Sequence, residues 1–176
     1  MPALDTLRAE VRFWKRLAAH DPLTGLLNRR GFEEAWDRMR ALMVRQGQGM
    51  GLLLIDLDRF KAINDRWGHE AGDRALVQCA RRLKAGLRAS DLLGRHGGDE
   101  FVVALPLGDR ESVSKVAERL ALAIGDREFR IARHRVRITF TVGTVCLEPG
   151  SDEPLRHLLR RADDVLRKKR VARSSP

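Results

Sequence analysis

The sequence predicts an α/β fold in which helices cover a sheet, and three observations carry this prediction. Stretches with apolar residues at helical spacing alternate along the chain with shorter stretches of strand character. The length of 176 residues and the hydrophobic fraction of 43% suit one domain with a buried core. No apolar run approaches the ~18 residues of a membrane span. The expected order is helix, strand, helix, hairpin, helix, strand, helix.

The first element is a stretch of helical spacing at the N-terminus. Its apolar residues are separated alternately by three and four positions: Leu4, Leu7, Val11, Trp14 and Ala18. This spacing is typical of a coiled-coil seam about two heptads long. A helix that lies on its own domain has the same pattern, and both interpretations stay open. We therefore divide the chain into an N-terminal helix at residues 1–20, a candidate dimerising stalk, and a domain at residues 21–176.

The remaining helices each show one apolar face. They are expected from residue 31 to a loop at 46–51, at 71–88, at 111–124 and at 154–170. Residues 51–58 form an apolar run bounded by glycine and acids, which predicts a buried strand. A hairpin is expected around residues 94–105, and the alternation at 128–147 indicates a hairpin and a strand. The strand at 51–58 and the hairpin can lie side by side in one sheet.

The chain carries a formal charge of +10, and arginine greatly outnumbers lysine. A basic surface attracts polyanions such as nucleic acid, anionic lipid or free nucleotides. A compositional bias toward arginine explains the charge equally well, because the arginines are spread along the chain. Cys79 and Cys146 sit in apolar patterns without metal-ligand spacing, and the N-terminus is too charged for a signal peptide. We therefore expect buried, reduced thiols in a cytoplasmic protein.

The stretch Gly97-Gly98-Asp99-Glu100 combines a turn with two carboxylates. Two glycines between apolar segments predict a tight turn, because glycine adopts positive φ without a steric clash. A turn does not need two acids at its exit, and adjacent carboxylates repel each other and favour a cation. Asp56 ends the strand at 51–58, so three carboxylates converge if that strand lies beside the hairpin. Such oxygen ligands are typical of a Mg²⁺ site for phosphoryl or nucleotidyl transfer.

Each half of this acidic set also has a plain structural interpretation. Asp56 and Asp58 fit a solvated sheet edge, and the glycines with their acids fit a simple turn. On a strand, Asp56 and Asp58 lie on one side, while the side chain of Leu57 points to the opposite face. The carbonyl of Leu57 remains available as a ligand. The conjunction of the two motifs favours function more than either motif alone.

The segment after the strand, RFKAINDRWGHEAGD, holds candidate nucleotide-binding groups. Phe60 and Lys61 lie at a step from loop to helix, where backbone N–H groups bind phosphate and Lys61 adds a positive charge. Asn64 offers a donor and an acceptor, and Asp73 offers acceptors only. Together they match guanine and argue against adenine. The structural alternative for Asn64 is a helix cap. For Asp73 the alternatives are an ion pair with Arg74 or a place in the first turn of a helix.

Three motifs, DPLTGLLNRR, LIDLDRFKAINDRWGHEAGD and RHGGDEF, strongly resemble the GGDEF-domain diguanylate cyclases of bacteria. The similarity runs from about Asp21 to Asp163 in matching order and spacing. It implies a nucleotidyl cyclase-like fold with a ferredoxin-like βααββαβ core and a central, mostly antiparallel sheet of five strands. It also implies that two GTP molecules become cyclic di-GMP and two pyrophosphates, for which two copies of the domain face each other in a homodimer.

The resemblance implies roles for residues at matching positions. Asp56, Asp99 and the carbonyl of Leu57 would bind two Mg²⁺ ions per active site, for which Mn²⁺ can substitute. Asp99, Glu100 and Lys61 would form the catalytic set, with Glu100 aiding metal binding or deprotonating the 3′-hydroxyl. The resemblance also implies the substrate contacts. Phe60, Lys61 and Arg170 would contact the phosphates, and Asn64 and Asp73 would contact guanine. Gly97 and Gly98 would leave room for the ribose and its α-phosphate.

Two further segments are compared with the family. Arg88 and Asp91, in the sequence RASD, fall at the position of the family's inhibitory product site, where arginine pairs with phosphate or guanine; a surface ion pair at a helix end is the alternative. The C-terminal segment departs from the family pattern A-D-x-A-L-Y-x-A-K-x-x-G-R-N. Arg167 replaces its tyrosine, Arg170 replaces its phosphate-contacting lysine, and the arginine of G-R-N is missing. These changes bear on the affinity for GTP, not on the metal ligands.

Three functions are therefore compared. An active cyclase agrees with the intact acidic and guanine-facing residues. A non-catalytic GGDEF domain that acts as a receptor for GTP or cyclic di-GMP agrees with the altered C-terminal segment. A nucleic-acid-binding module is supported by charge alone and lacks strands with interleaved aromatic residues, so no nucleic acid partner is expected.

Overall fold

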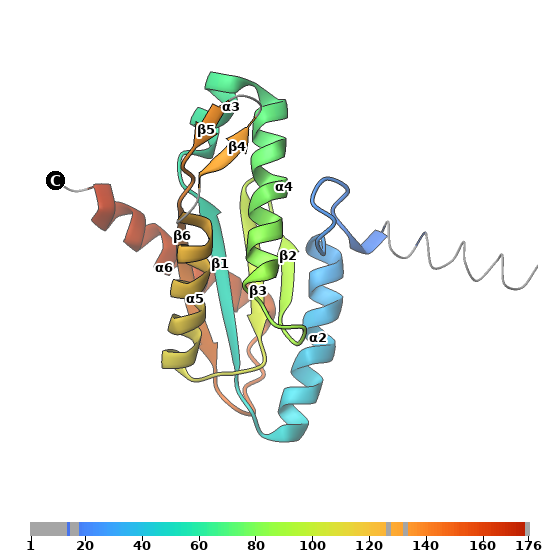
Figure 1. Ribbon diagram of the computed structural model, residues 1–176. Helices are drawn as coiled ribbons and strands as arrows, with labels where there is room; N and C mark the ends of the chain where they lie inside the picture. The colour runs from blue at the N-terminus through green and yellow to red at the C-terminus, as the bar shows by residue number, and fades with distance from the viewer. Residues whose placement is uncertain (1–13, 15–17, 126–127, 132–133, 175–176) are drawn as a thin grey trace, which may run out of the picture.

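The structure is a computed structural model that describes residue 14 and residues 18–125, 128–131 and 134–174 (Figure 1). Helices and strands follow the expected order, except that a separate short helix, α3, precedes the helix expected at 71–88. The helices are α2 (Arg29–Gln46), α3 (Phe60–Trp67), α4 (His69–Ala85), α5 (Arg110–Gly125) and α6 (Leu155–Ser174). The strands are β1 (Met50–Leu57), β2 (Leu92–Arg95), β3 (Glu100–Leu105), β4 (Phe129–Ile131), β5 (His134–Val136) and β6 (Phe140–Leu147).

The central sheet has the strand order β2-β3-β1-β6, and every pair of neighbours is antiparallel. The expected α/β class with a sheet flanked by helices is confirmed, and the hairpin does lie beside β1. The expected number of five strands is wrong for the described residues, because the sheet has four. The short strands β4 and β5 pair with each other as a separate two-stranded ribbon at one end of the molecule (Figure 1). That ribbon is held against α4 instead of extending the sheet.

Two hydrophobic cores lie on the two faces of the sheet, and β1 contributes to both. Leu53, Ile55 and Leu57 belong to the core under α3, α4 and α5. Leu52 and Leu54 belong to the core under α2 and α6. This alternation follows from the period of two residues in a strand. It also places the next side chain of the second set, Asp56, on the face that α6 covers.

The helices bury the faces that their apolar spacing predicts. In α5 all five expected inward residues are buried: Val113, Val116, Ala117, Leu120 and Ile124. In α2 the expected face is buried apart from Met39, which is partly exposed. Cys79 is buried as expected, whereas Cys146 is only half-buried, and both are free thiols. The apolar pattern therefore located the cores correctly and overstated the burial of Cys146.

Helix α6 crosses β6 at very short range. A Cβ atom on Gly143 would lie 1.9 Å from the carbonyl oxygen of Ala162, so only glycine permits this approach. The close crossing carries the last turns of α6 over the end of β1. It is the reason that Arg170, near the end of the chain, contacts Asp56 in the sheet.

The predicted seam at residues 4–18 lies outside the described residues, apart from Trp14 and Ala18, and stays a prediction. Among the helices that the structure describes, none has the length and apolar character needed to cross a membrane.

Candidate functional site

The three predicted carboxylates meet where β1 ends. Asp56 of β1 pairs with Glu100 of β3, and the backbone N–H of Leu57 donates to the carbonyl of Asp99 at 3.3 Å. Asp56 is 9% exposed. The guanidinium of Arg170 on α6 forms a hydrogen-bonded ion pair with Asp56. The end of the sheet therefore concentrates negative charge with one arginine against it.

The electrostatics of this cluster favour a cation. Burial raises the pKa of Asp56, and Asp99 and Glu100 raise it further, while Arg170 opposes them. Burial also raises the pKa of Glu100, together with the nearby charges of Asp99 and Asp163. Both shifts mean that these carboxylates would gain from positive charge nearby.

The donor set fits Mg²⁺ that arrives with a phosphate ligand. Among the described residues, no group of three or more His, Cys, Asp or Glu side chains forms a metal site by itself. Mg²⁺ usually takes one or two protein carboxylates and completes its shell with water and substrate phosphates. Asp56, Asp99 and the carbonyl of Leu57 offer such a partial shell at one end of the sheet.

The glycines of the hairpin tip are needed because they leave room for neighbouring groups, and not because the backbone has an unusual conformation. Neither Gly97 nor Gly98 has a positive φ, so the expected conformational reason for them is wrong. A Cβ on Gly97 would lie 2.6 Å from Oε2 of Glu100, and a Cβ on Gly98 would meet nothing within 4 Å. Gly97 thus leaves room for the Glu100 side chain, and Gly98 faces open space from which a ligand can approach.

Arg95 holds this tip in place, a role that the sequence analysis missed. Its guanidinium donates to the carbonyl of Gly98 at 2.7 Å and forms an ion pair with Asp21 at 3.1 Å. Asp21 in turn accepts hydrogen bonds from the hydroxyl of Thr24 at 2.6 Å and from its N–H at 2.8 Å. Asp21 and Arg95 both lie inside motifs that the sequence analysis quoted, so these motifs could have pointed to a role for the two residues.

The turn between β1 and α3 is tied to β6 by Asp58. The hydroxyls of Thr139 and Thr141 each donate to one carboxylate oxygen of Asp58 at 2.7 Å, and the N–H of Asp58 donates to the carbonyl of Thr139 at 2.9 Å. Arg59 follows with φ 55°, the only described non-glycine residue in the left-handed region. Phe60 and Lys61 begin α3 directly after this turn, at the helix end whose first N–H groups have no partner within the helix. Phosphate binding there stays a prediction.

The two predicted guanine readers lie at the junction of α3 and α4. Asn64 packs against Gly72, where a Cβ would lie 1.9 Å from Oδ1 of Asn64 and 3.0 Å from the ring of Phe60. Asp73 is the next residue of α4 and is exposed. The alternative ion pair between Asp73 and Arg74 is wrong, because Arg74 pairs with Glu70 at 3.7 Å. Gly72 was missed by the sequence analysis although it sets the position of Asn64.

A cavity of about 780 Å³ opens beside this turn. Asp58, Arg59 and Arg170 line one part of it, and Arg66, Trp67 and Arg137 line the other. Phe60 and Lys61 begin α3 on the same turn. The structure therefore brings most of the predicted site residues to one end of the sheet, and Arg170 is the one among them that also lines this basic cavity.

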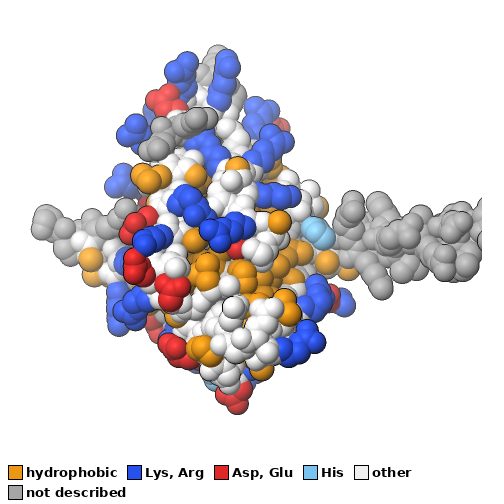
Figure 2. Space-filling view, turned by 60° about the horizontal axis from the view of Figure 1, so that its bottom comes forward, with side chains coloured by type: hydrophobic (Ala, Val, Ile, Leu, Met, Phe, Trp, Pro, Cys, Tyr) orange, Lys and Arg blue, Asp and Glu red, His pale blue; other side chains and the backbone are white. Residues whose placement is uncertain are grey.

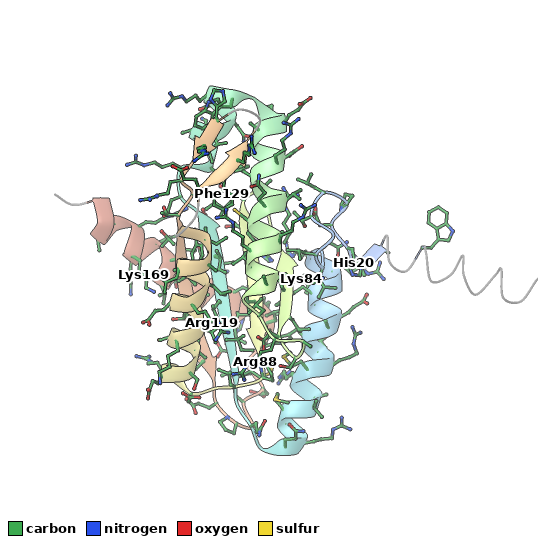
Figure 3. The ribbon with its side chains drawn as sticks, viewed as in Figure 1. His20, Lys84, Arg88, Arg119, Phe129 and Lys169 are labelled. Carbon is green, nitrogen blue, oxygen red and sulfur yellow. The ribbon has the colours of Figure 1, made fainter. Side chains whose placement is uncertain are left out.

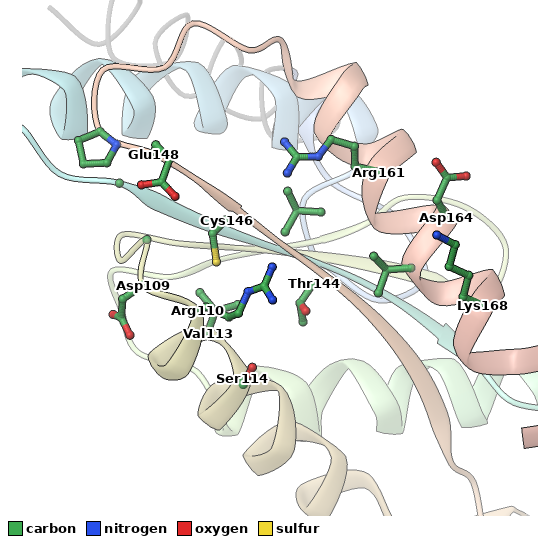
Figure 4. A pocket seen from close by; sticks show the side chains of 15 residues that line it. Asp109, Arg110, Val113, Ser114, Thr144, Cys146, Glu148, Arg161, Asp164 and Lys168 are labelled. Atoms are coloured by element: carbon green, nitrogen blue, oxygen red, sulfur yellow. The ribbon is translucent and has the colours of Figure 1, made fainter. Parts of the chain in front are cut away.

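A second cavity of about 850 Å³ lies along the free edge of β6, between α5 and α6 (Figure 4). It contains none of the predicted site residues. Its basic side chains are matched by acidic ones: Arg110, Arg161 and Lys168 against Asp109, Glu148 and Asp164. Despite its larger volume, this balanced lining does not suit a polyphosphate, and the site is better placed at the carboxylate cluster.

Arg88 and Asp91 lie apart from the carboxylate cluster. The carboxylate of Asp91 accepts from the N–H of Arg88 at 2.8 Å, so the two residues form a closed turn and not a side-chain ion pair. A cavity of about 240 Å³ is lined by both of them together with Lys84 and His20. Figure 3 labels His20, Lys84 and Arg88. The side chains of Lys84 and Arg88 make this small cavity basic.

The structure is thus an α/β domain with a carboxylate cluster at one end of an antiparallel sheet. The family described as "Diguanylate cyclase, GGDEF domain" matches residues 18–175, and the chain belongs to that family. The chain is 37% identical over 162 residues to the response regulator PleD of Caulobacter vibrioides, covering 91% of this chain and 36% of PleD. It is 38% identical over 160 residues to the diguanylate cyclase DgcP of Pseudomonas aeruginosa, covering 90% of this chain and 24% of DgcP. The chain thus spans well under half of each relative.

Solved structures agree with this assignment. The fold matches the coiled coil and GGDEF domain of DgcB from Caulobacter crescentus, crystallised with c-di-GMP, with a TM-score of 0.88 and 26% identity over 97% of this chain and 90% of that chain. It matches the GGDEF domain of TpbB (YfiN) from Pseudomonas aeruginosa with a TM-score of 0.79 and 37% identity over 86% of this chain and 89% of that chain.

Proposed function

We propose that this chain is a diguanylate cyclase, which condenses two GTP molecules into cyclic di-GMP and two pyrophosphates. The observation that supports this most is the meeting of Asp56, Asp99 and Glu100 at one end of the sheet, beside a fixed phosphate-binding turn. Membership of the GGDEF family supports the same reaction.

In this proposal Asp56, Asp99 and the carbonyl of Leu57 hold Mg²⁺, two ions per active site, or Mn²⁺ in its place. The bound ions supply charge neutralisation and polarise the phosphoryl oxygens. Arg170 would then contribute its charge to the triphosphate, in place of the lysine found in the family pattern.

The remaining residues bind and orient GTP. The N–H groups of Phe60 and Lys61 at the start of α3, with the ammonium of Lys61, bind the β- and γ-phosphates. The Asn64 amide both donates to the guanine edge and accepts from it, whereas the Asp73 carboxylate only accepts from guanine N–H groups that adenine lacks. The open space at Gly98 admits the ribose and α-phosphate. Most of the catalytic effect would come from this positioning.

The bond changes follow from this arrangement. The 3′-hydroxyl oxygen of one GTP bonds to the α-phosphorus of the other, and the bond from that phosphorus to the bridging oxygen breaks. Pyrophosphate leaves with the electron pair, and the hydroxyl proton passes to Glu100, whose pKa burial raises. The reaction must occur twice on facing nucleotides, so a second copy of the chain supplies the second GTP in a homodimer.

Regulation by product would use the cavity at Arg88 and Asp91. Arg88 and Lys84 offer cations for the phosphates of cyclic di-GMP, and the closed turn at Asp91 fixes the backbone of Arg88. Product bound there would inhibit synthesis.

A receptor that binds GTP or cyclic di-GMP without turnover is the second candidate. The C-terminal segment favours it, because α6 lacks the arginine of the family's G-R-N pattern and places Arg170 where a lysine is expected. Arginine and lysine differ in reach and in hydrogen-bond geometry, so the triphosphate contacts would differ.

The test is incubation of nucleotide-free protein with GTP and Mg²⁺ at high protein concentration, with analysis by chromatography and mass spectrometry. Asp99→Asn is the test variant, and Asp164→Asn, an exposed acid on α6 away from the cluster, is the matched control. Cyclic di-GMP from the parent and the control, but not from Asp99→Asn, supports the cyclase. Binding of GTP or cyclic di-GMP without product supports the receptor.

A further inference from the structure

The cavity beside α3 extends well beyond the turn that would hold a triphosphate. Its inner end, at Asp58, Arg59 and Arg170, adjoins the carboxylate cluster. Its outer end is formed by Arg66 and Trp67 of α3 and by Arg137 after β5. Arg66 lies six residues beyond Phe60, about 9 Å further along the helix axis. A volume of about 780 Å³ lies within the range of small-molecule sites.

The lining of this cavity is strongly basic. Four arginines face one carboxylate, and both oxygens of that carboxylate, on Asp58, accept threonine hydroxyls at 2.7 Å. Among the described residues, neither Arg66 nor Arg137 has an ion-pair partner. A cleft lined by one sign of charge concentrates ions of the opposite sign. The end of the molecule that carries α3 and the ribbon shows mainly basic side chains (upper part of Figure 2).

The outer end is also held in a defined arrangement. The guanidinium of Arg66 lies 5.0 Å from the ring centroid of Trp67. The same ring lies 5.9 Å from that of His134 on β5, which joins α3 to the ribbon. Arginine stacked on an aromatic ring keeps its N–H edge available for a phosphate oxygen. The walls that carry Arg66 and Arg137 are thus fastened to each other.

We propose that this outer end binds a phosphoanhydride chain through Arg66 and Arg137, either as free pyrophosphate or as the terminal phosphates of a nucleotide longer than a triphosphate. Two separate guanidinium groups suit an anion with two linked phosphates better than a single phosphate, because each can form bidentate contacts. The proposal rests on the proposed function in one respect, namely the side from which the phosphate chain enters the cavity. If the α-phosphate lies beside the carboxylates, pyrophosphate is released next to this cavity, because Arg170 both pairs with Asp56 and lines the cavity.

The experiment is isothermal titration of the full chain with sodium pyrophosphate in the absence of Mg²⁺, and with the α,β-methylene analogue of GTP. Arg137→Ala and Arg66→Ala are the test variants. Arg135→Ala is the matched control, because Arg135 lies on β5 two residues before Arg137, pairs with Glu128 at 3.7 Å and does not line the cavity. Each test variant is expected to bind pyrophosphate about tenfold more weakly than the parent, a change of ~1.4 kcal/mol. Its affinity for the GTP analogue should stay within about twofold of that of the parent.

Guanosine 5′-tetraphosphate separates the two sources of the ligand. If the variants also lose the tetraphosphate's advantage over the GTP analogue, the outer end accepts nucleotide phosphates; if only pyrophosphate is affected, it accepts the free anion. Equal pyrophosphate affinity in Arg137→Ala, Arg66→Ala and Arg135→Ala overturns the proposal. If the pyrophosphate affinities are equal but the protein makes cyclic di-GMP, the proposed function stands without this inference. If the test variants lose pyrophosphate affinity but the protein makes no cyclic di-GMP, only the proposed cyclase activity is rejected.

Discussion

At the scale of single residues, Gly72 controls the position of a predicted guanine reader. Alanine there would put a methyl group 1.9 Å from Oδ1 of Asn64, so Asn64 and the ring of Phe60 must move. We expect Gly72→Ala to weaken binding of the GTP analogue by about tenfold, and overpacking to cost ~1–3 kcal/mol of unfolding free energy. Calorimetric titration and urea unfolding measure the two effects.

The control for this prediction is Gly125→Ala at the end of α5, where a Cβ meets nothing within 4 Å and φ is not positive. Its nucleotide affinity should equal that of the parent. An unchanged affinity in Gly72→Ala as well would mean that Asn64 does not read the base.

Asp21 gives a pH-dependent contribution to stability. Burial raises its pKa, but hydrogen bonds from Thr24 and the charge of Arg95 lower it more, so the folded-state pKa lies below the unfolded value of ~3.9. Folding therefore favours the ionised form. The stabilisation is complete above the unfolded pKa and is lost as pH falls through the folded pKa.

We expect Asp21→Asn to lower the free energy of unfolding by ~1–3 kcal/mol at pH 7, with a deficit that shrinks below about pH 4. Urea unfolding of both proteins at pH 7, 5 and 3 measures it, with the exposed Asp152→Asn as control. A deficit of the same size at pH 3 as at pH 7 would show that the charge of Asp21 is not involved.

At the scale of elements, Arg82 of α4 fastens α5 and the ribbon to each other. Its guanidinium donates to the carbonyls of Ile124 at 3.0 Å and Glu128 at 2.9 Å, and it lies 3.8 Å from the ring centroid of Phe129. We expect Arg82→Ala to destabilise the fold by ~2–4 kcal/mol, because the carbonyls of Ile124 and Glu128 lose this donor and Phe129 loses the cation over its ring. Thermal unfolding tests this, and Arg81→Ala, exposed on the same helix, should stay close to the parent.

The elements also show what sequence patterns can and cannot predict. Apolar spacing identified the buried face of α5 residue by residue, because that face depends only on the helical period. The strand count failed because β4 and β5 alternate like sheet strands, and nothing local shows that they pair only with each other. The carboxylate cluster was predictable from Asp56 and the hairpin motif. The hydrogen bonds from Thr139 and Thr141 to Asp58 were not predictable, because they join residues 81 and 83 positions apart in the sequence.

At the scale of the whole molecule, α4 separates the two predicted nucleotide sites. Its 17 residues form a helix about 26 Å long, with Asp73 near its start and Arg88 three residues beyond its end. Inhibition by product at Arg88 must therefore act at a distance or by holding domains apart. We expect the Arg88→Ala protein to make cyclic di-GMP to a higher final concentration, measured by chromatography, and to bind it at least tenfold more weakly, measured by calorimetry.

Lys115→Ala, at an exposed residue of α5, is the control. The same final product concentration and the same affinity in both variants would contradict the product site.

Dimerisation is the last property that belongs to the whole molecule. If two copies must each supply one GTP, the active fraction follows mass action, and specific activity should rise in proportion to protein concentration when dimers are scarce. Removal of residues 1–17 should lower activity in this dilute range, if the N-terminal seam aligns the copies, and have little effect at saturation. The cut spares Ala18, whose carbonyl accepts from the Asn28 side chain that caps α2. Activity assays paired with sedimentation velocity measure both quantities. Equal activity and equal dimer fraction after truncation would exclude the seam, and specific activity independent of concentration in a monomeric protein would exclude the facing-copy mechanism itself.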